Sequence, residues 1–163
     1  LLLEYIHWLR FTHDHRFEPA GRSLTRLLRQ AHQWAEVYQP GKGALRSWEP
    51  SALKARSYFT RAGNELRIVE LTDAVALWRE GGRMNNCVAS YRRACLAGFS
   101  RIWSMRLLRV DELPKSVLTI EFNQTLNTVV QVKGRGNRAP RTFELGLVKK
   151  WATEQGAKGD LHY

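Results

Sequence analysis

Cys87 is the residue whose type and position best suit reactive chemistry. It follows Asn85 and Asn86, either of which can cap a helix, so we expect its thiol in the first helical turn. The positive end of the helix dipole and nearby arginines such as Arg83 would lower the pKa of that thiol and make it nucleophilic. The competing interpretation, which we favour, is a small buried apolar side chain, the usual fate of a free cysteine. No histidine occurs between residues 33 and 161, so the neighbouring sequence offers no Cys–His pair.

Residues 131–141, QVKGRGNRAPR, combine four cations, two glycines and an asparagine with no acid. The segment continues an apolar run, VVQV, that is typical of a strand. Glycines allow the backbone to approach a ligand closely, and Asn137 tolerates the left-handed conformation that a tight loop needs. Arginine binds phosphate well because its planar fork can donate two parallel hydrogen bonds. We therefore interpret this segment as a phosphate-binding loop, although it contains no P-loop motif.

Three strands rich in β-branched and aromatic residues are expected at 100–108, 115–122 and 127–134. Alternation along them places a polar set on one face and leaves an apolar face for the core. A hairpin near Thr125–Leu126 would bring Glu121 opposite Gln131. The polar face is either a solvated surface or one wall of a site whose other wall is the start of the Cys87 helix. The polar set comprises Arg106, Glu121, Gln131 and Lys133, with Val129 on the same side.

The composition favours a folded protein that binds nucleic acid. The 163 residues are 44% hydrophobic, enough for a core, and carry a formal net charge of +11 with a pI near 10.3. No apolar run approaches the roughly 18 residues of a membrane span, so we expect a soluble cytoplasmic protein without a membrane partner. Cys87 and Cys95 would lie too far apart on one helix for a disulfide and should be reduced. The chain lacks an initiator methionine, so we expect a fragment of a longer protein.

One short run, His13-Asp14-His15, contains residue types that bind metals. No further ligands cluster with it, and no CxxC pair occurs. We therefore predict neither a metal site nor a cofactor.

The periodicity of the chain predicts an α+β fold. The region 1–62 is expected to be helical, with Ser23 capping a helix over 24–38 and a short helix at 52–59. The domain at 63–163 would begin with a turn at 63–64 and a strand at 65–71. Two helices would follow, the first capped by Thr72 and ended by Gly81 and Gly82, the second running from Cys87 to Gly98. The three strands then form an antiparallel meander, and a helix over 142–156 closes the domain.

Several motifs in this order resemble the PcfJ-like family, whose members occur on conjugative plasmids and phages. The motifs are LWREGGRMNNCVASY, TIEF and VVQVKGRGNRAP, followed by a helix containing KKW, and the resemblance spans roughly residues 66–155. It implies related folds and a mobile-element context more than a defined mechanism. Many relatives have histidine before the cysteine where this chain has Asn86, which argues against a Cys–His mechanism. The family pattern corresponds to Glu80, Gly81, Asn86, Cys87, Tyr91, Glu121, Gln131, Gly134 and Asn137.

These observations predict a domain that binds RNA or single-stranded DNA in a mobile-element or phage-related system, with protein partners of a larger assembly as a further expectation. The alternative is an enzyme, a nuclease or a thiol-dependent transferase, with Cys87, Glu121 and Gln131 at its site. A scaffold that binds proteins through Trp-rich helices is a third class, and whether the domain is an enzyme stays open. Glu121 would be a structural partner of Arg106, as we favour, or a general base. The predicted nucleic-acid contacts are Arg83, Arg92, Arg93, Arg106, Lys133, Arg135, Asn137, Arg138 and Arg141.

Overall fold

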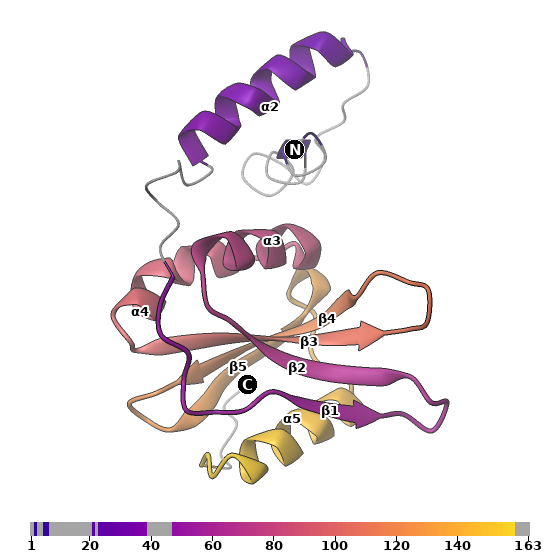
Figure 1. The fold of residues 1–163 in the computed structure, drawn as a ribbon, viewed down its shortest axis with the longest axis vertical. Coiled ribbons are helices and arrows are strands. Elements are labelled where there is room, and N and C mark those ends of the chain that lie inside the picture. The colour runs from indigo at the N-terminus through magenta and orange to yellow at the C-terminus, as the bar shows by residue number, and fades with distance from the viewer. Residues whose placement is uncertain (1, 3–4, 7–20, 22, 39–46, 159–163) are drawn as a thin grey trace. The chain divides into compact units, whose positions relative to one another are not determined.

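The structure, a computed structural model, describes residues 2, 5–6, 21, 23–38 and 47–158 (Figure 1). These residues form four α-helices, two short 3₁₀-helices and one five-stranded antiparallel sheet. The chain divides into two compact units, residues 1–46 and 47–163. The second unit begins before the predicted boundary at 62–63 because the segment ahead of that boundary pairs with the sheet.

The first unit contains the predicted capped helix. Helix α2 spans Leu24–Tyr38, and the Ser23 hydroxyl accepts a hydrogen bond from the backbone N–H of Arg26 at 3.3 Å. Leu27 and Ala31, one turn apart, are buried, whereas Leu24 and Leu28 are exposed. The run His13-Asp14-His15 lies outside the described residues.

The sheet has the order β1-β2-β3-β4-β5, with strands Arg56–Phe59, Glu65–Leu71, Ser100–Leu108, Lys115–Asn123 and Thr128–Gly134. The three predicted strands are confirmed as β3, β4 and β5, and the strand over 65–71 as β2. The predicted three-stranded meander is nevertheless wrong, because β1 and β2 extend the same sheet. The predicted helix at 52–59 is also wrong, since Arg56–Phe59 pairs antiparallel with β2 across the turn at Gly63. Pairing with the next strand across a short turn outweighed the weak helical pattern of that segment.

Helix α3 spans Ala74–Met84 and differs from the prediction at both ends. Its cap is Asp73, whose carboxylate accepts a hydrogen bond from the N–H of Ala76 at 2.7 Å, and not Thr72. The helix runs through Gly81 and ends at Asn85, which has a left-handed φ of 49°. Gly81 does not terminate the helix. It permits a close approach, because a Cβ there would lie 3.2 Å from the backbone oxygen of Asn86.

The predicted helix from Cys87 to Gly98 is divided in two. Val88–Tyr91 forms the 3₁₀-helix η1, and Arg92–Leu96 forms α4. Cys87 therefore precedes a four-residue 3₁₀-helix, which lacks the long row of aligned peptide dipoles on which the dipole argument depends. The favoured interpretation of Cys87 as buried is wrong as well, because Cys87 is exposed and Cys95 is the buried cysteine. Both thiols are free, as predicted.

Helices cover both faces of the sheet (Figure 1). Helix α5, Thr142–Glu154, lies on one face and contributes Trp151 to a core in which its ring lies 4.8 Å from that of Trp103. Helices α3 and α4 lie on the other face, over a second cluster that includes Leu77 and Ile102. The face predicted to be polar is therefore covered in part, because Ser104 and Thr119 are buried whereas Gln131 is exposed.

A β-bulge changes one predicted side-chain orientation. Glu121 pairs with Gln131, as predicted, but the next residue, Phe122, pairs with Val129, so Val130 is an extra residue in β5. Val129 consequently joins the apolar core with Phe122 instead of sharing a face with Gln131.

Candidate functional site

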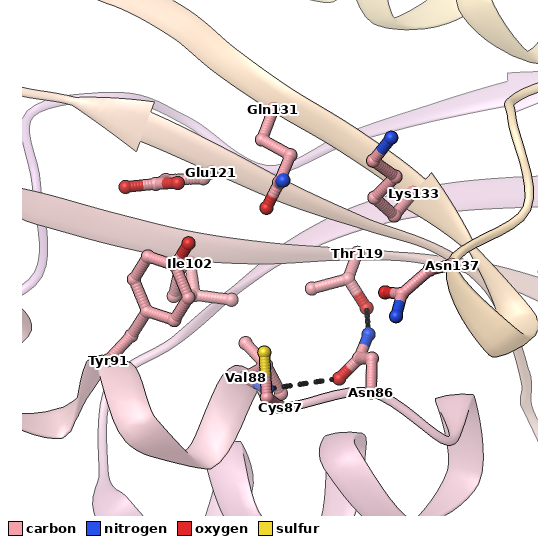
Figure 2. Close-up of a pocket in the computed structure, with 10 residues that line it drawn as sticks. All are labelled: Asn86, Cys87, Val88, Tyr91, Ile102, Thr119, Glu121, Gln131, Lys133 and Asn137. Atoms are coloured by element: carbon pink, nitrogen blue, oxygen red, sulfur yellow. Dashed lines mark hydrogen bonds between the residues drawn. The ribbon is translucent and has the colours of Figure 1, made fainter. Parts of the chain in front are cut away.

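A small open pocket lies between η1 and the sheet face opposite α5 (Figure 2). Its volume of about 30 Å³ would hold roughly two water molecules, so it can accept the edge of a ligand and not a whole nucleotide. Four residues singled out in the sequence line it. They are the candidate catalytic residues Cys87, Glu121 and Gln131, and Asn137 of the basic loop. The lining comprises Asn86, Cys87, Val88, Tyr91, Ile102, Thr119, Glu121, Gln131, Lys133 and Asn137.

A buried hydrogen-bonded chain supports the helical wall of the pocket. Glu80 of α3 is only 1% exposed, and its carboxylate accepts hydrogen bonds from Ser116 Oγ at 2.9 Å and Thr119 Oγ1 at 3.2 Å. Thr119 in turn accepts from Asn86 Nδ2 at 3.1 Å, and Asn86 Oδ1 accepts from the N–H of Val88 at 3.2 Å. The whole chain of donors and acceptors is satisfied, as buried polar groups require.

This network fixes the position of Cys87. The residue lies between Asn86, which is held by the sheet, and Val88, whose N–H is held by Asn86. Its sulfur points from η1 towards the strands (Figure 2). A solvent-accessible thiol on a rigid wall facing polar groups can act as a nucleophile or as a wall of a binding site.

Glu121 has structural partners other than the one predicted. Its Oε1 accepts a hydrogen bond from Ser100 Oγ at 2.9 Å, and the Tyr91 hydroxyl also donates to its carboxylate. Burial, followed by the charge and hydrogen bond of Glu121, raises the pKa of Tyr91 to about 12, so its hydroxyl keeps its proton at neutral pH. The predicted pairing with Arg106 is wrong, because the register places Ile102 opposite Glu121 and Arg106 opposite Ser116, and the Arg106 Nε donates to Ser104 Oγ at 3.3 Å.

The opposite wall of the pocket is formed by β5 and the 3₁₀-helix η2, Arg135–Asn137. Gln131 lies directly across from Glu121, and Lys133 lies across from Thr119. Asn137 has the predicted left-handed backbone, with φ of 60°. Within the described part of the chain, the side chains of Gln131, Lys133 and Asn137 have neither a hydrogen-bond partner nor an ion-pair partner. These three polar groups are therefore available to a ligand.

Arg138 is engaged within the fold. Its two terminal nitrogens donate to both carboxylate oxygens of Glu144, each at 2.8 Å, and Glu144 is 1% exposed. Burial alone would raise the pKa of Glu144, but the hydrogen bonds from Arg138 and from the N–H of Arg141 outweigh it and lower that pKa. Gly134 makes room for this arrangement, since a Cβ there would lie 2.5 Å from the Arg138 side chain. The loop itself contains no acidic residue, but the charge of its Arg138 is neutralised by Glu144, which follows the loop in the chain.

The other predicted contact residues lie at the surface, apart from Arg106, which is half-buried. Those whose side chains are exposed and pair with no carboxylate in the described residues are Arg83, Arg92, Arg93, Arg135 and Arg141. Arg101, in contrast, is buried and donates to the backbone oxygen of Cys95. Sequence analysis missed Ser100 and Ser116 as supports of the two carboxylates. Ser100 alternates with Ser104 on the predicted polar face, which was the signal available. Ser116 alternates with Leu118 on the predicted apolar face, and the register shift between Met105 and Arg106 opposite it had no sequence signal.

Two features are absent from the described residues. No group of three histidine, cysteine, aspartate or glutamate residues there is arranged to hold a metal ion. No helix in those ranges has both the length and the apolar character needed to cross a membrane.

The fold and the pocket define a basic α+β protein with a polar site between a covering helix pair and an antiparallel sheet. A family model described as PcfJ-like protein matches residues 7–144, and the chain belongs to this family. No curated protein and no solved structure matches the chain. All nine residues of the family pattern lie at or behind the pocket. Glu80, Gly81 and Gly134 support its walls, and the other six line it.

Proposed function

We propose that this domain binds single-stranded nucleic acid, RNA or DNA, in a mobile-element or phage-related system of the cytoplasm. The observation that carries the proposal is a pocket whose lining includes polar side chains without partners in the described residues, with exposed cations close in sequence to those lining residues. Arg83 lies in the last turn of α3, Arg92 begins α4 next to Tyr91, and Arg135 lies between Lys133 and Asn137. These cations can neutralise phosphates, and the pocket can take one group from a strand whose bases are not paired.

A pair of charge-matched variants tests the proposal. Replacing Arg92 and Arg135 with glutamine should weaken binding of a short fluorescent oligonucleotide and flatten the dependence of log affinity on log salt by about 1.4, or about 0.7 for each contact. The control replaces Arg56 and Arg61 with glutamine, which removes the same charge from exposed positions on and beside β1. Equal losses in both double variants would show that binding depends on net charge and not on this surface.

An enzyme is the second candidate, favoured by the exposed thiol of Cys87 in the same pocket as Glu121. A nuclease using Glu121 or a transferase using Cys87 would act on the bound strand. Cys87→Ser and Glu121→Gln should then abolish turnover of a labelled oligonucleotide while the affinity is kept. Binding without any turnover in the unmodified protein would leave the first proposal and exclude this one for nucleic-acid substrates.

A further inference from the structure

We infer that the pocket recognises the amino–keto edge of an unpaired guanine or cytosine base, an inference that rests on the proposed binding of single-stranded nucleic acid. Three groups in it have no partner in the described residues, namely Gln131, Lys133 and Asn137. Glu121 is only partly used, because a carboxylate has more acceptor positions than the two that its contacts with Ser100 and Tyr91 occupy. The pocket therefore presents hydrogen-bonding capacity that the fold itself leaves unused.

The order of these groups is set by the strands. Gln131 is directly opposite Glu121, and Lys133 is two residues further along β5 on the same face. Glu121 and Lys133 are thus diagonal neighbours, about 7–8 Å apart at their backbones. Their charges are opposite, yet they do not form an ion pair with each other. Across the pocket, Glu121 therefore offers a hydrogen-bond acceptor, Gln131 an amide that can accept or donate, and Lys133 a donor.

Cytosine and guanine match this order along their Watson–Crick edges. In each base an exocyclic amine at one end can donate to Glu121, a ring nitrogen in the middle can pair with the amide of Gln131, and a carbonyl at the other end can accept from Lys133. Uracil and thymine would place a carbonyl against the carboxylate of Glu121. Adenine has the amine but lacks the carbonyl that would accept from Lys133.

The size and walls of the pocket fit recognition of an edge. A volume of about 30 Å³ excludes a whole base, so the ring would project from the pocket beside Tyr91 and Ile102. The Tyr91 hydroxyl already donates to Glu121 and helps to orient its carboxylate. Arg92 and Arg135, next to the lining residues, would then contact the flanking phosphates.

The test compares oligonucleotides of about ten nucleotides that are all thymine except for one central base. Fluorescence anisotropy should show about tenfold tighter binding with a central guanine or cytosine than with thymine or adenine. In Glu121→Gln this preference should fall to about twofold while the affinity for the all-thymine strand is kept, because charge-assisted hydrogen bonds are about twice as strong as neutral ones. The control Glu112→Gln removes a charge from the exposed turn before β4 and should keep the tenfold preference.

Each outcome separates the two proposals. Equal binding of all four strands by the unmodified protein, or a preference that survives in a folded Glu121→Gln, would overturn the base-edge inference while the binding function stands. Absence of binding to every strand would overturn the binding function itself. If Glu121→Gln fails to fold, Lys133→Met provides the same comparison, since it removes the ammonium group assigned to the carbonyl. A full preference in that variant would also overturn the inference.

Discussion

Replacing Arg138 with methionine should destabilise the second unit by about 3 kcal/mol. Arg138 donates two hydrogen bonds of 2.8 Å to the carboxylate of Glu144, which is 1% exposed. Removing one partner of a buried ion pair costs about 3–5 kcal/mol, because the remaining charge is left buried and poorly compensated. The Arg138 side chain is itself 36% exposed, so water screens part of the interaction and the lower end of that range applies.

Urea denaturation followed by tryptophan fluorescence measures this loss, because Trp103 and Trp151 lie in the core on which α5 packs. With a denaturant slope of about 2 kcal/mol per molar, a loss of about 3 kcal/mol lowers the midpoint by about 1.5 M. Arg135→Met is the matched control, since Arg135 is an exposed cation of the same loop with no carboxylate partner in the described residues. Its midpoint should change by less than about 0.25 M, which corresponds to about 0.5 kcal/mol.

The order of the two variants should reverse when affinity for an oligonucleotide is measured in place of stability. Arg135→Met should weaken binding of an oligonucleotide, whereas Arg138→Met, measured where it is folded, should bind almost as the unmodified protein does. A midpoint that moves equally in both variants would refute the structural role of Arg138. A larger loss of affinity in Arg138→Met would return it to the phosphate-binding surface.

Three further predictions concern the same unit. Gly81→Ala should destabilise the protein by about 1 kcal/mol, because its Cβ would lie 3.2 Å from the backbone oxygen of Asn86, a residue that the sheet holds in place. Gly82→Ala has open space around it and should stabilise the protein by about 0.5–1 kcal/mol through helix propensity. Melting temperatures that shift in the same direction in both variants would contradict this. Iodoacetamide should modify one thiol in the native protein, that of Cys87, and a second only after unfolding, because burial raises the pKa of Cys95 to about 11; two adducts in the native state, seen by intact mass, would be the contrary result. The lowered pKa of Glu144 contributes stability that is present above its unfolded value near 4.3 and is lost as the pH falls through its folded value, so the melting temperature should drop below about pH 4, and Glu144→Gln should show a shallower acid dependence.

The sequence alone determined those features whose signals are local. Alternation of side chains and a short turn place Glu121 opposite Gln131, because the period of a strand and the length of a hairpin loop fix the register. The hydroxyl of Ser23 caps α2 for a reason confined to one helical turn. Asn137 takes a left-handed backbone because its side chain tolerates one. Each of these was predictable without knowledge of the rest of the fold.

Other features depend on pairing with other strands of the sheet, and only the tertiary structure decided them. Residues 56–59 form a strand because β2 offers an edge to pair with, although their own sequence favours a helix weakly. The bulge at Val130 moves Val129 into the core, and no periodicity marks it.

The site depends on such contacts most of all. Cys87 is exposed on a rigid wall because Asn86 reaches Thr119, which is 33 residues away in the chain. Arg138 is neutralised by a glutamate that follows the acid-free loop and is buried under it. Side-chain types and spacing indicated which residues would gather, but the partner of each charge was fixed by burial, which depends on how the segments pack together.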